Sequence, residues 1–528
     1  MPEYLHPGVY IEEIERGPRP IEGVPTSTAA FLGETERGPI KPRLVTSYKE
    51  YQRWFGGVFG QDKYLPYAIN GFFENGGKRV FVSRLVGEAA TTAQLQIGSY
   101  AIRASAPGSW GKRVWVKITP SSTKDQHGSP IGFRIQLAYW TGNPPALFDP
   151  FTAEGRRTIP QPSLTEDFND LVLDENSPDY VGKRFPFIDL GKGVTNQGPD
   201  SSALGLLVRN VGTDPFELPQ TSTSAALAEG GDDDPAALGT PDYVGLPGGS
   251  RVDLQGLSAL ELDPYRDVAL VYAPAVSTDI ANQIIIHCEN MRFRFAVIDS
   301  DKGMNDPSAL NPRNILNTDT NYAGYYYPWI WISDPATGAR KLVPPGGHSL
   351  GVFARTDSER GVFKAPANEL LRGALDLEID INDQTQDVLN PQSVNVIRQF
   401  PGRGIRIWGA RTITSNALWK YVSVRRLFIF LERSIYEGTQ WVVFEPNDPR
   451  LWARVTDTIR LFLRTQWRLG ALYGRTEEQA FFITCNETVM SQDDILNGRL
   501  ICEIGIAPVR PAEFVIFRIF QNTAEAQR

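Results

Sequence analysis

The sequence has few of the residues that most often bind metals or form disulfides. Among its 528 residues there are only three cysteines and four histidines. The cysteines, Cys288, Cys485 and Cys502, are too few and too scattered for a disulfide framework or a zinc site. This usage is typical of a protein made in a reducing compartment. We therefore predict no metal site and no bound cofactor.

Two further absences restrict the class of protein. No apolar run approaches the ~18 residues that span a bilayer, and the opening MPEYLHPGVY lacks the basic and then apolar order of a signal peptide. The formal net charge of −8 argues against a protein that binds nucleic acid by neutralising phosphates. We expect synthesis in the cytoplasm, no direct membrane insertion and no nucleic-acid partner.

Positive charge is concentrated in one region. Residues 401–528 carry 17 Lys and Arg against 13 Asp and Glu, although the whole chain is acidic. Here the segment DPRLWARVTDTIRLFLRTQWRLG predicts a helix with Asp448 as its N-cap and Pro449 in its first turn. At about 100° per residue, one side of this helix is apolar and the other is rich in arginine. Arginine suits planar carboxylate partners, so we expect docking on an acidic surface, with a solvated face as the alternative, through Arg450, Arg454, Arg464 and Arg468.

The order of the predicted elements indicates an α/β (α+β) core with a mixed sheet. STAAFLGET predicts a buried strand, SYKEYQRWFGG and YAINGFFENGG predict helices that stop at glycine pairs, and KRVFVSRLV predicts another strand. RDVALVYAPA, TDIANQIIIHCENM and RFAVIDS read as strand, helix and strand, a βαβ unit that implies a parallel sheet. YYYPWIWISD predicts a further strand, VNVIRQFPGRGIRIWGART predicts a hairpin, and two long helices follow.

The segment from about residue 91 to residue 255 has a different sequence pattern. Alternating strands joined by Gly and Pro turns give way to longer polar loops, which predicts a mostly β inserted domain. We expect this domain to face outward. The resulting division is an N-terminal arm (1–22), a first core segment (23–90), the inserted domain (91–255), a second core segment (256–505) and a C-terminal arm (506–528).

Both predicted arms resemble strands that need a partner. PAEFVIFRIFQ, near the end of the sequence, is apolar on both faces of a strand, and such a strand is an aggregation hazard when it is left unpaired. GVYIEEI alternates like a strand and is followed by prolines that keep the chain extended. We therefore predict strand pairing between subunits, carried by Val9, Tyr10, Ile11 and Ile14 and by Phe514, Val515, Ile516, Phe517, Ile519 and Phe520.

One motif supports an enzyme as the alternative. GHSLG, residues 347–351, fits the G-x-S-x-G elbow of serine hydrolases, whose chain order is Ser, acid and then His. All four histidines, of which His348 is the last, precede Ser349, so the triad order fails. We predict no catalytic residue and interpret the motif as a glycine-rich turn into a helix. In GFFENGGK, Gly77 stands where a phosphate loop has its lysine, so we predict no phosphate site there. DLEIDINDQTQD is interpreted as a charged edge strand.

Several blocks, in order along the chain, resemble contractile tail sheath proteins. They are HPGVYIEEIERGPRPIEGVPTSTAAFLGETERGP, FFENGGKRVFVSRL, PGSWGKRVWVKI, PPGGHSLGVFARTDSERGVFKAPANELLRG and NVIRQFPGRGIRIWGARTI, with the helical region up to FVIFRIFQ. The family comprises the sheaths of contractile phage tails, R-type pyocins and extracellular contractile injection systems. The resemblance covers about residues 6–90 and 256–521, and at the inserted domain only its start.

The resemblance implies a structural subunit of a helical sheath of stacked hexameric rings. Its partners would be further copies of itself, an inner tube protein, and baseplate and terminator or cap proteins. The arms would add strands to a neighbour's sheet, and contraction would drive the tube through a target envelope. Assembly would take place in the cytoplasm, with possible later release as part of a phage-like particle. Another tail or baseplate structural protein is a further alternative.

Overall fold

The computed structural model describes residues 20–145, 149–197, 200–245 and 255–517, and the chain divides into two compact units. The larger, here called the sheet unit, comprises Thr26–Arg360 and Lys364–Val422. The smaller, the helical unit, is described over residues 20–25, 361–363 and 423–517. The finer domain boundaries expected from the sequence stay a prediction.

The centre of the sheet unit is a mixed sheet of nine described strands in the order β18-β21-β20-β15-β14-β13-β1-β3-β2. Neighbouring strands from β20 to β3 run parallel, and the outer strands at both edges run antiparallel. The predicted parallel βαβ unit and the hairpin are both confirmed. The strands are β1 (Ala29–Gly33), β2 (Arg43–Val45), β3 (Val80–Arg84), β13 (Leu270–Tyr272), β14 (Phe295–Asp299), β15 (Ala323–Tyr327), β18 (Glu369–Leu370), β20 (Val394–Phe400) and β21 (Gly404–Ile407).

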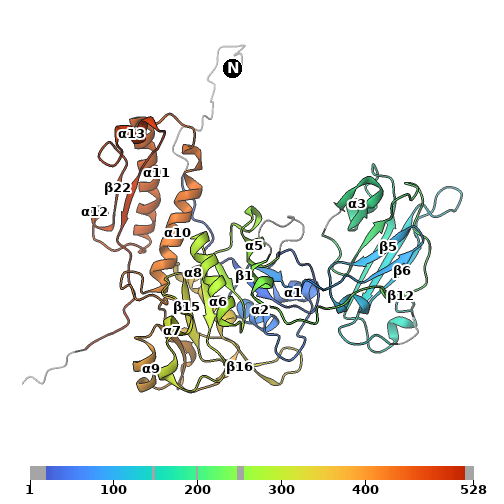
Figure 1. Cartoon of the computed structure of the whole chain (residues 1–528), viewed down its shortest axis with the longest axis horizontal. Coiled ribbons are helices and arrows are strands. Elements are labelled where there is room, and N and C mark those ends of the chain that lie inside the picture. The colour runs from blue at the N-terminus through green and yellow to red at the C-terminus, as the bar shows by residue number, and fades with distance from the viewer. Residues whose placement is uncertain (1–19, 146–148, 198–199, 246–254, 518–528) are drawn as a thin grey trace, which may run out of the picture. The chain divides into compact units, whose positions relative to one another are not determined.

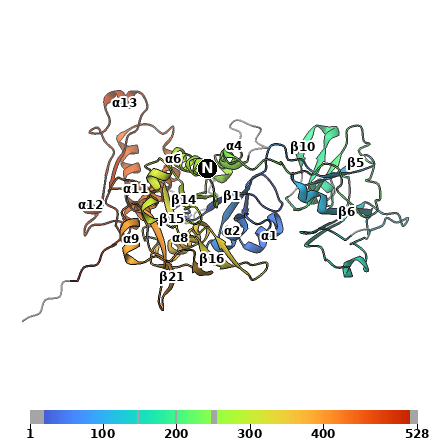
Figure 2. The same cartoon turned by 60° about the horizontal axis from the view of Figure 1, so that its bottom comes forward.

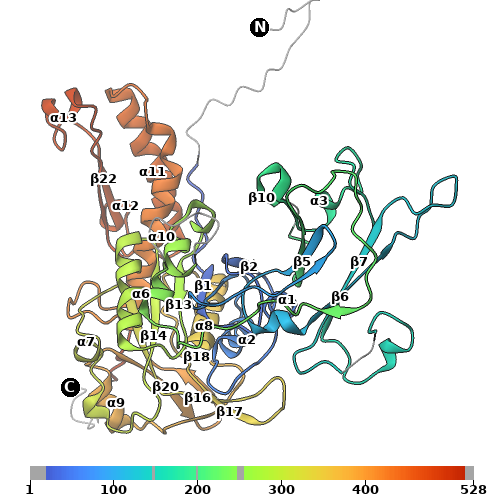
Figure 3. The ribbon, with the colours of Figure 1, turned by 45° about the vertical axis from the view of Figure 1, so that its right-hand side comes forward.

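Helices cover both faces of this sheet. Figure 3 shows β13 and β14 between α6 (Thr278–Met291) and α8 (Gly346–Arg360), and both helices contact both strands. The α6 face is filled by alternate strand residues such as Val271, Ala296 and Ile298. Outside the β-sandwich, the described α-helices of this unit also include α1 (Tyr48–Phe55), α2 (Leu65–Glu74), α4 (Thr240–Val244), α5 (Gly256–Leu260), α7 (Pro312–Ile315) and α9 (Asp383–Leu389).

Two further sheets form a β-sandwich within the inserted segment. Figure 2 shows β5 and β10 of one sheet and β6 of the other. Trp110, Ile102 and Leu137 are among the residues of a shared apolar core. The elements are β4 (Gln94–Ile97), β5 (Tyr100–Ala104), β9 (Phe187–Asp189), β10 (Val194–Gln197) and β11 (Gly205–Arg209) in the first sheet; β6 (Val114–Pro120), β7 (Phe133–Tyr139), β8 (Leu164–Leu171) and β12 (Ala225–Ala226) in the second; and helix α3 (Val181–Arg184).

Two local predictions are wrong. YYYPWIWISD forms two strands, because the chain leaves β15 at Pro328 and enters a separate three-stranded sheet of β16 (Ile330–Ser333), β17 (Arg340–Val343) and β19 (Ala374–Leu377). The acidic segment predicted as an edge strand is a strand only up to Leu377. Its second half is helix α9, since the Asn382 side chain caps the helix by accepting from the Thr385 backbone N–H at 2.8 Å.

The helical unit packs two long helices against a hairpin (Figure 1). Leu431 of the first helix and Ile459 and Phe462 of the second are buried in its core. The predicted pair of long helices is confirmed, and Asp448 caps the second helix by accepting from the Leu451 N–H at 2.8 Å. The elements are α10 (Val422–Gly438), α11 (Pro449–Arg468), α12 (Glu477–Ala480), β22 (Phe481–Thr484), α13 (Gln492–Leu496) and β23 (Glu503–Ile506).

Candidate inter-subunit surfaces

The hairpin of the helical unit is a two-stranded sheet with open edges. Among the described residues, β22 and β23 pair only with each other. Phe481 faces the core, whereas Phe482 is 58% exposed on the other face. Gly505 stands opposite Phe482, and a Cβ at this glycine would lie 2.0 Å from the ring, so any larger residue would require the exposed ring to shift. Open strand edges of this kind accept further strands.

The segment after the hairpin carries the predicted C-terminal arm. Val509 N–H still donates to the Ala471 carbonyl at 3.2 Å, but residues 511–517 form neither helix nor strand in the single chain. Their pairing with another subunit stays a prediction. A run of four exposed apolar side chains is unusual on a soluble protein and indicates a contact surface: Phe514 is 72% exposed, Val515 69%, Ile516 78% and Phe517 83%.

The N-terminal arm is described only where it meets the helical unit. Ile21 is buried in the core, where a Cβ at Gly438 would lie 2.6 Å from it. The Val24 N–H donates to the Ser434 hydroxyl of α10 at 3.1 Å. The base of this arm is therefore fixed to α10. The predicted contact residues Val9, Tyr10, Ile11 and Ile14, together with Ile519 and Phe520 of the other arm, lie outside the described residues.

Two of the four predicted docking arginines already have acidic partners within the helical unit. Arg464 binds both carboxylate oxygens of Glu477, at 2.6 and 3.2 Å. This hydrogen bond raises the pKa of Arg464. Arg454 forms a 2.9 Å ion pair with Glu445 and lies over the ring of Trp441. These carboxylates reduce the positive charge that the helix presents.

The other two arginines remain available for docking. Arg450 and Arg468 are exposed, and neither has an ion pair with any other described residue. They are 18 positions apart, five full turns of helix, so they share one face about 27 Å apart. Exposed Leu461 lies between them on that face. The residues predicted on the opposite, apolar side are Val455, Ile459, Phe462 and Leu469. The first three are buried as expected, whereas Leu469 is 63% exposed just beyond the helix.

The GHSLG motif is a packing motif in this structure. It forms the first turns of α8, and His348 and Ser349 are 1% and 0% exposed, so no substrate reaches the hydroxyl. The motif lies in helix from Gly346 onward, so the expected turn before the helix is wrong. A Cβ at Gly71 of α2 would lie 2.3 Å from the His348 ring, and a Cβ at Gly347 would lie 2.5 Å from Ala68. The glycines allow close approach of the two helices.

A buried carboxylate caps this helix. Asp299, at the end of β14, accepts from the Gly346 N–H at 2.8 Å and from the Tyr272 hydroxyl at 2.6 Å. A carboxylate is favourable at a helix N-terminus. Burial nevertheless raises the pKa of Asp299 to about 7, and burial lowers the pKa of His348 to about 4. The group at the centre of the motif is therefore a neutral imidazole in a dry core.

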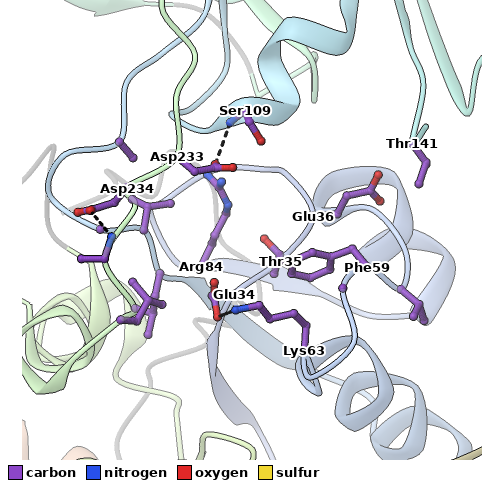
Figure 4. A pocket seen from close by; sticks show the side chains of 18 of the residues that line it. Glu34, Thr35, Glu36, Phe59, Lys63, Arg84, Ser109, Thr141, Asp233 and Asp234 are labelled. Atoms are coloured by element: carbon purple, nitrogen blue, oxygen red, sulfur yellow. Dashed lines mark hydrogen bonds and ion pairs between the residues drawn. The ribbon is translucent and has the colours of Figure 1, made fainter. Parts of the chain in front are cut away.

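A cavity of about 570 Å³ lies beside the segments that join the sandwich to the large sheet (Figure 4). Its charged groups bind one another or the backbone: Lys63 forms an ion pair with Glu34, and the Ser109 N–H donates to Asp233 at 2.8 Å. Buried Arg84 donates to the carbonyl oxygens of Gly38 and Pro107 at 3.0 and 2.9 Å. Burial lowers the pKa of Arg84 to about 10, so it keeps its charge at neutral pH. These interactions fix the segments that join the sandwich to the large sheet.

The described residues contain no group of three or more His, Cys, Asp or Glu side chains that could hold a metal ion. Within the same part of the chain, no helix has the length and hydropathy required to cross a membrane. The structure does bring Cys485 and Cys502 together at the end of the hairpin. Sequence spacing did not predict this proximity, since it depends on the register of the two strands.

Three family models match the chain one after another. The phage tail sheath protein beta-sandwich domain matches residues 86–232, the phage tail sheath protein central domain matches residues 236–413, and the phage tail sheath C-terminal domain matches residues 414–522. The first of these matches corresponds to the segment that forms the two packed sheets. Together the three models match residues 86–232 and 236–522, which lie in both the sheet unit and the helical unit.

Individual relatives agree with these matches. A tail sheath protein of Burkholderia phage BcepMu is 24% identical over 493 residues, which cover 89% of this chain and 88% of the relative. The sheath complex of an extracellular contractile injection system, PVC, in its contracted state has a TM-score of 0.59 at 22% identity and covers 100% of both chains. A chain of the anti-feeding prophage baseplate has a TM-score of 0.54 at 22% identity, covering 98% of this chain and 99% of its own.

Proposed function

The chain belongs to the phage tail sheath family, and we propose that it is the subunit that polymerises helically around an inner tube and contracts to drive the tube through a target envelope. The polymer is a stack of hexameric rings. The subunit works without a cofactor and performs no catalysis. Its other partners are the tube protein and the baseplate and terminator proteins, and it assembles in the cytoplasm as part of a phage-like particle.

The observation that carries this proposal is the match between an unpaired strand edge and an unpaired apolar segment. The β22–β23 hairpin offers two open edges, and residues 514–517 offer backbone groups with exposed apolar side chains. The two surfaces on one chain differ, so their contact is heterologous. Heterologous contacts that do not close a ring produce an open helical polymer. Strand addition also lets subunits rotate while the backbone connection between them persists.

Contraction then requires a second contact that only the extended state makes. We assign this contact to the exposed face of α11 with Arg450 and Arg468, which would hold an acidic surface of the tube. Arg454 and Arg464 contribute less, since Glu445 and Glu477 already neutralise them. A sheath with two arrangements of rigid subunits is a bistable assembly, and a trigger at the baseplate shifts it from one to the other.

The test is truncation after Arg510, which removes the predicted strand and leaves the hairpin intact. We expect the full chain to form long hollow cylinders in electron micrographs and the truncated chain to remain a folded monomer. Circular dichroism spectra that match for the two chains exclude misfolding as the cause. Cylinders formed by the truncated chain contradict strand exchange as the basis of assembly.

One alternative has support of its own, because the chain is also similar to a baseplate component of the anti-feeding prophage. A baseplate subunit would form an assembly of fixed size and would require other baseplate proteins to do so. The same micrographs separate the two roles, since only a sheath subunit forms cylinders of indefinite length.

A further inference from the structure

The hairpin places two cysteines directly opposite each other. Phe481 pairs with Ile506, and the register continues to the pair of Thr484 with Glu503. Continued by one residue beyond the ends of β22 and β23, this register brings Cys485 opposite Cys502. Directly opposite residues in an antiparallel pair have Cα atoms roughly 4.5–5.5 Å apart. A disulfide requires a Cα separation of about 4.4–6.8 Å, so two residues paired in this way have the backbone spacing that a disulfide needs.

The side chains of this pair also lie on the same face. Alternation along the strand puts Cys485 on the side of Phe481, which faces the core. Cys485 is 7% exposed, and half-buried Cys502 packs against the same core. Burial raises the pKa of the Cys485 thiol, and a hydrogen bond from Cys502 acts in the opposite direction. The register therefore places the two thiols next to each other, whereas Cys288 is buried in the other unit.

We propose that Cys485 and Cys502 form a reversible disulfide when the folded chain meets a small-molecule disulfide such as oxidised glutathione. The Cys502 thiolate, the more exposed, attacks one glutathione sulfur and releases a first glutathione thiolate. The Cys485 thiolate then attacks the Cys502 sulfur of the mixed disulfide and releases the second. The protein dithiol is oxidised, the glutathione disulfide is reduced to two thiols, and the two thiol protons of the protein pass to these products.

The bond would stabilise the sheet that the proposed assembly uses, although the inference does not depend on that assembly. It would join the two strands at the point where the segment of residues 486–501 leaves them, and so fix their register. Closing a loop of this size lowers the conformational entropy of the unfolded chain and so favours the folded state. Burial raises the pKa of the Cys502 thiol to about 12. The thiolate is the nucleophile, so oxidation is slow near neutral pH and accelerates about tenfold per pH unit.

Peptide mapping of the full folded chain tests the proposal. Trypsin cleaves after Arg475 and Arg499 but not between Arg510 and Pro511, so the two cysteines fall in separate peptides, 476–499 and 500–518. Native protein is treated with oxidised glutathione, alkylated and digested without reductant. We expect these two peptides linked, with the mass of two hydrogen atoms lost, and a melting temperature higher by roughly 5–10 °C. Cys288→Ser should behave identically, and Cys485→Ser should leave glutathione attached at Cys502.

The wild-type digest decides the question even if a variant fails to fold. Two alkylated thiols after treatment, or glutathione retained on Cys502 without a linked peptide, overturn the proposal. So does a linked peptide that forms only after the chain has been unfolded in urea, since the native register would then not bring the thiols together. Release of the link by a dithiol reductant, with the melting temperature returning to its starting value, supports reversibility.

Discussion

Replacing Val515 by aspartate tests the proposed strand exchange with the smallest change. Val515 is 69% exposed in the single chain, so the substitution should leave folding unchanged within about 0.5 kcal/mol. In the polymer the side chain is expected to be buried in a neighbour's sheet. Losing a buried valine forfeits about 1.5–2 kcal/mol, and placing a carboxylate in an apolar contact adds at least ~1 kcal/mol. A total of about 3 kcal/mol per contact should raise the concentration required for assembly about 100-fold.

The assay is sedimentation of assembled sheath over a range of subunit concentrations, with electron microscopy of the pellets. Val211→Asp is a matched control, because Val211 is also an exposed valine, at 76%, but lies after β11 in the β-sandwich. We expect the control to assemble like the wild type. Equal critical concentrations for Val515→Asp and the wild type, with equal melting temperatures, would refute the assignment of this segment as an inter-subunit strand.

Three further predictions concern the remaining sites. Arg450→Glu combined with Arg468→Glu should leave the melting temperature unchanged, yet reduce co-sedimentation of purified tube with extended sheath, and undiminished tube binding would disprove the docking role. Ser349→Ala should stabilise the chain by about 1 kcal/mol in urea unfolding, because the buried hydroxyl has no hydrogen-bond partner among the described residues; a fall in stability contradicts this. Burial raises the pKa of Asp299 to about 7, so ionisation of this group lowers the free energy of unfolding as the pH rises from about 4 to 7. Burial lowers the pKa of His348 to about 4, so deprotonation of the unfolded chain raises the free energy of unfolding between about pH 4 and 6.5. Asp299→Asn should therefore steepen the rise of the unfolding free energy with pH by about 1.4 kcal/mol per unit, and parallel profiles for the two proteins would be evidence against it.

Local patterns predicted much of the fold. Gly56 follows the end of α1 as predicted, and the Ser47 side chain, which was not predicted as a cap, caps its start by accepting from the Glu50 N–H. The parallel pairing around α6 also followed from the strand and helix pattern. Strand order was not predictable, because β1 pairs with β13 across the whole inserted segment. Nothing in the local pattern of either strand identifies such a distant neighbour.

The candidate surfaces divide in the same way. Helical periodicity correctly placed the arginines of α11 on one side, but it could not reveal that Glu477, beyond the end of the helix, neutralises Arg464. The sequence predicts that the aromatic and aliphatic run at 514–517 is a strand that needs a partner, and this stays a prediction. The exposure of this run in the folded subunit is decided by the tertiary structure, because it depends on the chain leaving the hairpin after Val509.

The sequence by itself determined the family, the two long helices of the helical unit and the apolar character of residues 514–517, because each depends on residues that are close together in the chain or on blocks with a distinctive order. Only the tertiary structure decided which chemical groups meet. Packing of Gly71 against His348 buried the motif that resembled a hydrolase. The register of one hairpin brought together two of three scattered cysteines, since pairing in an antiparallel sheet depends on strand alignment and not on sequence spacing.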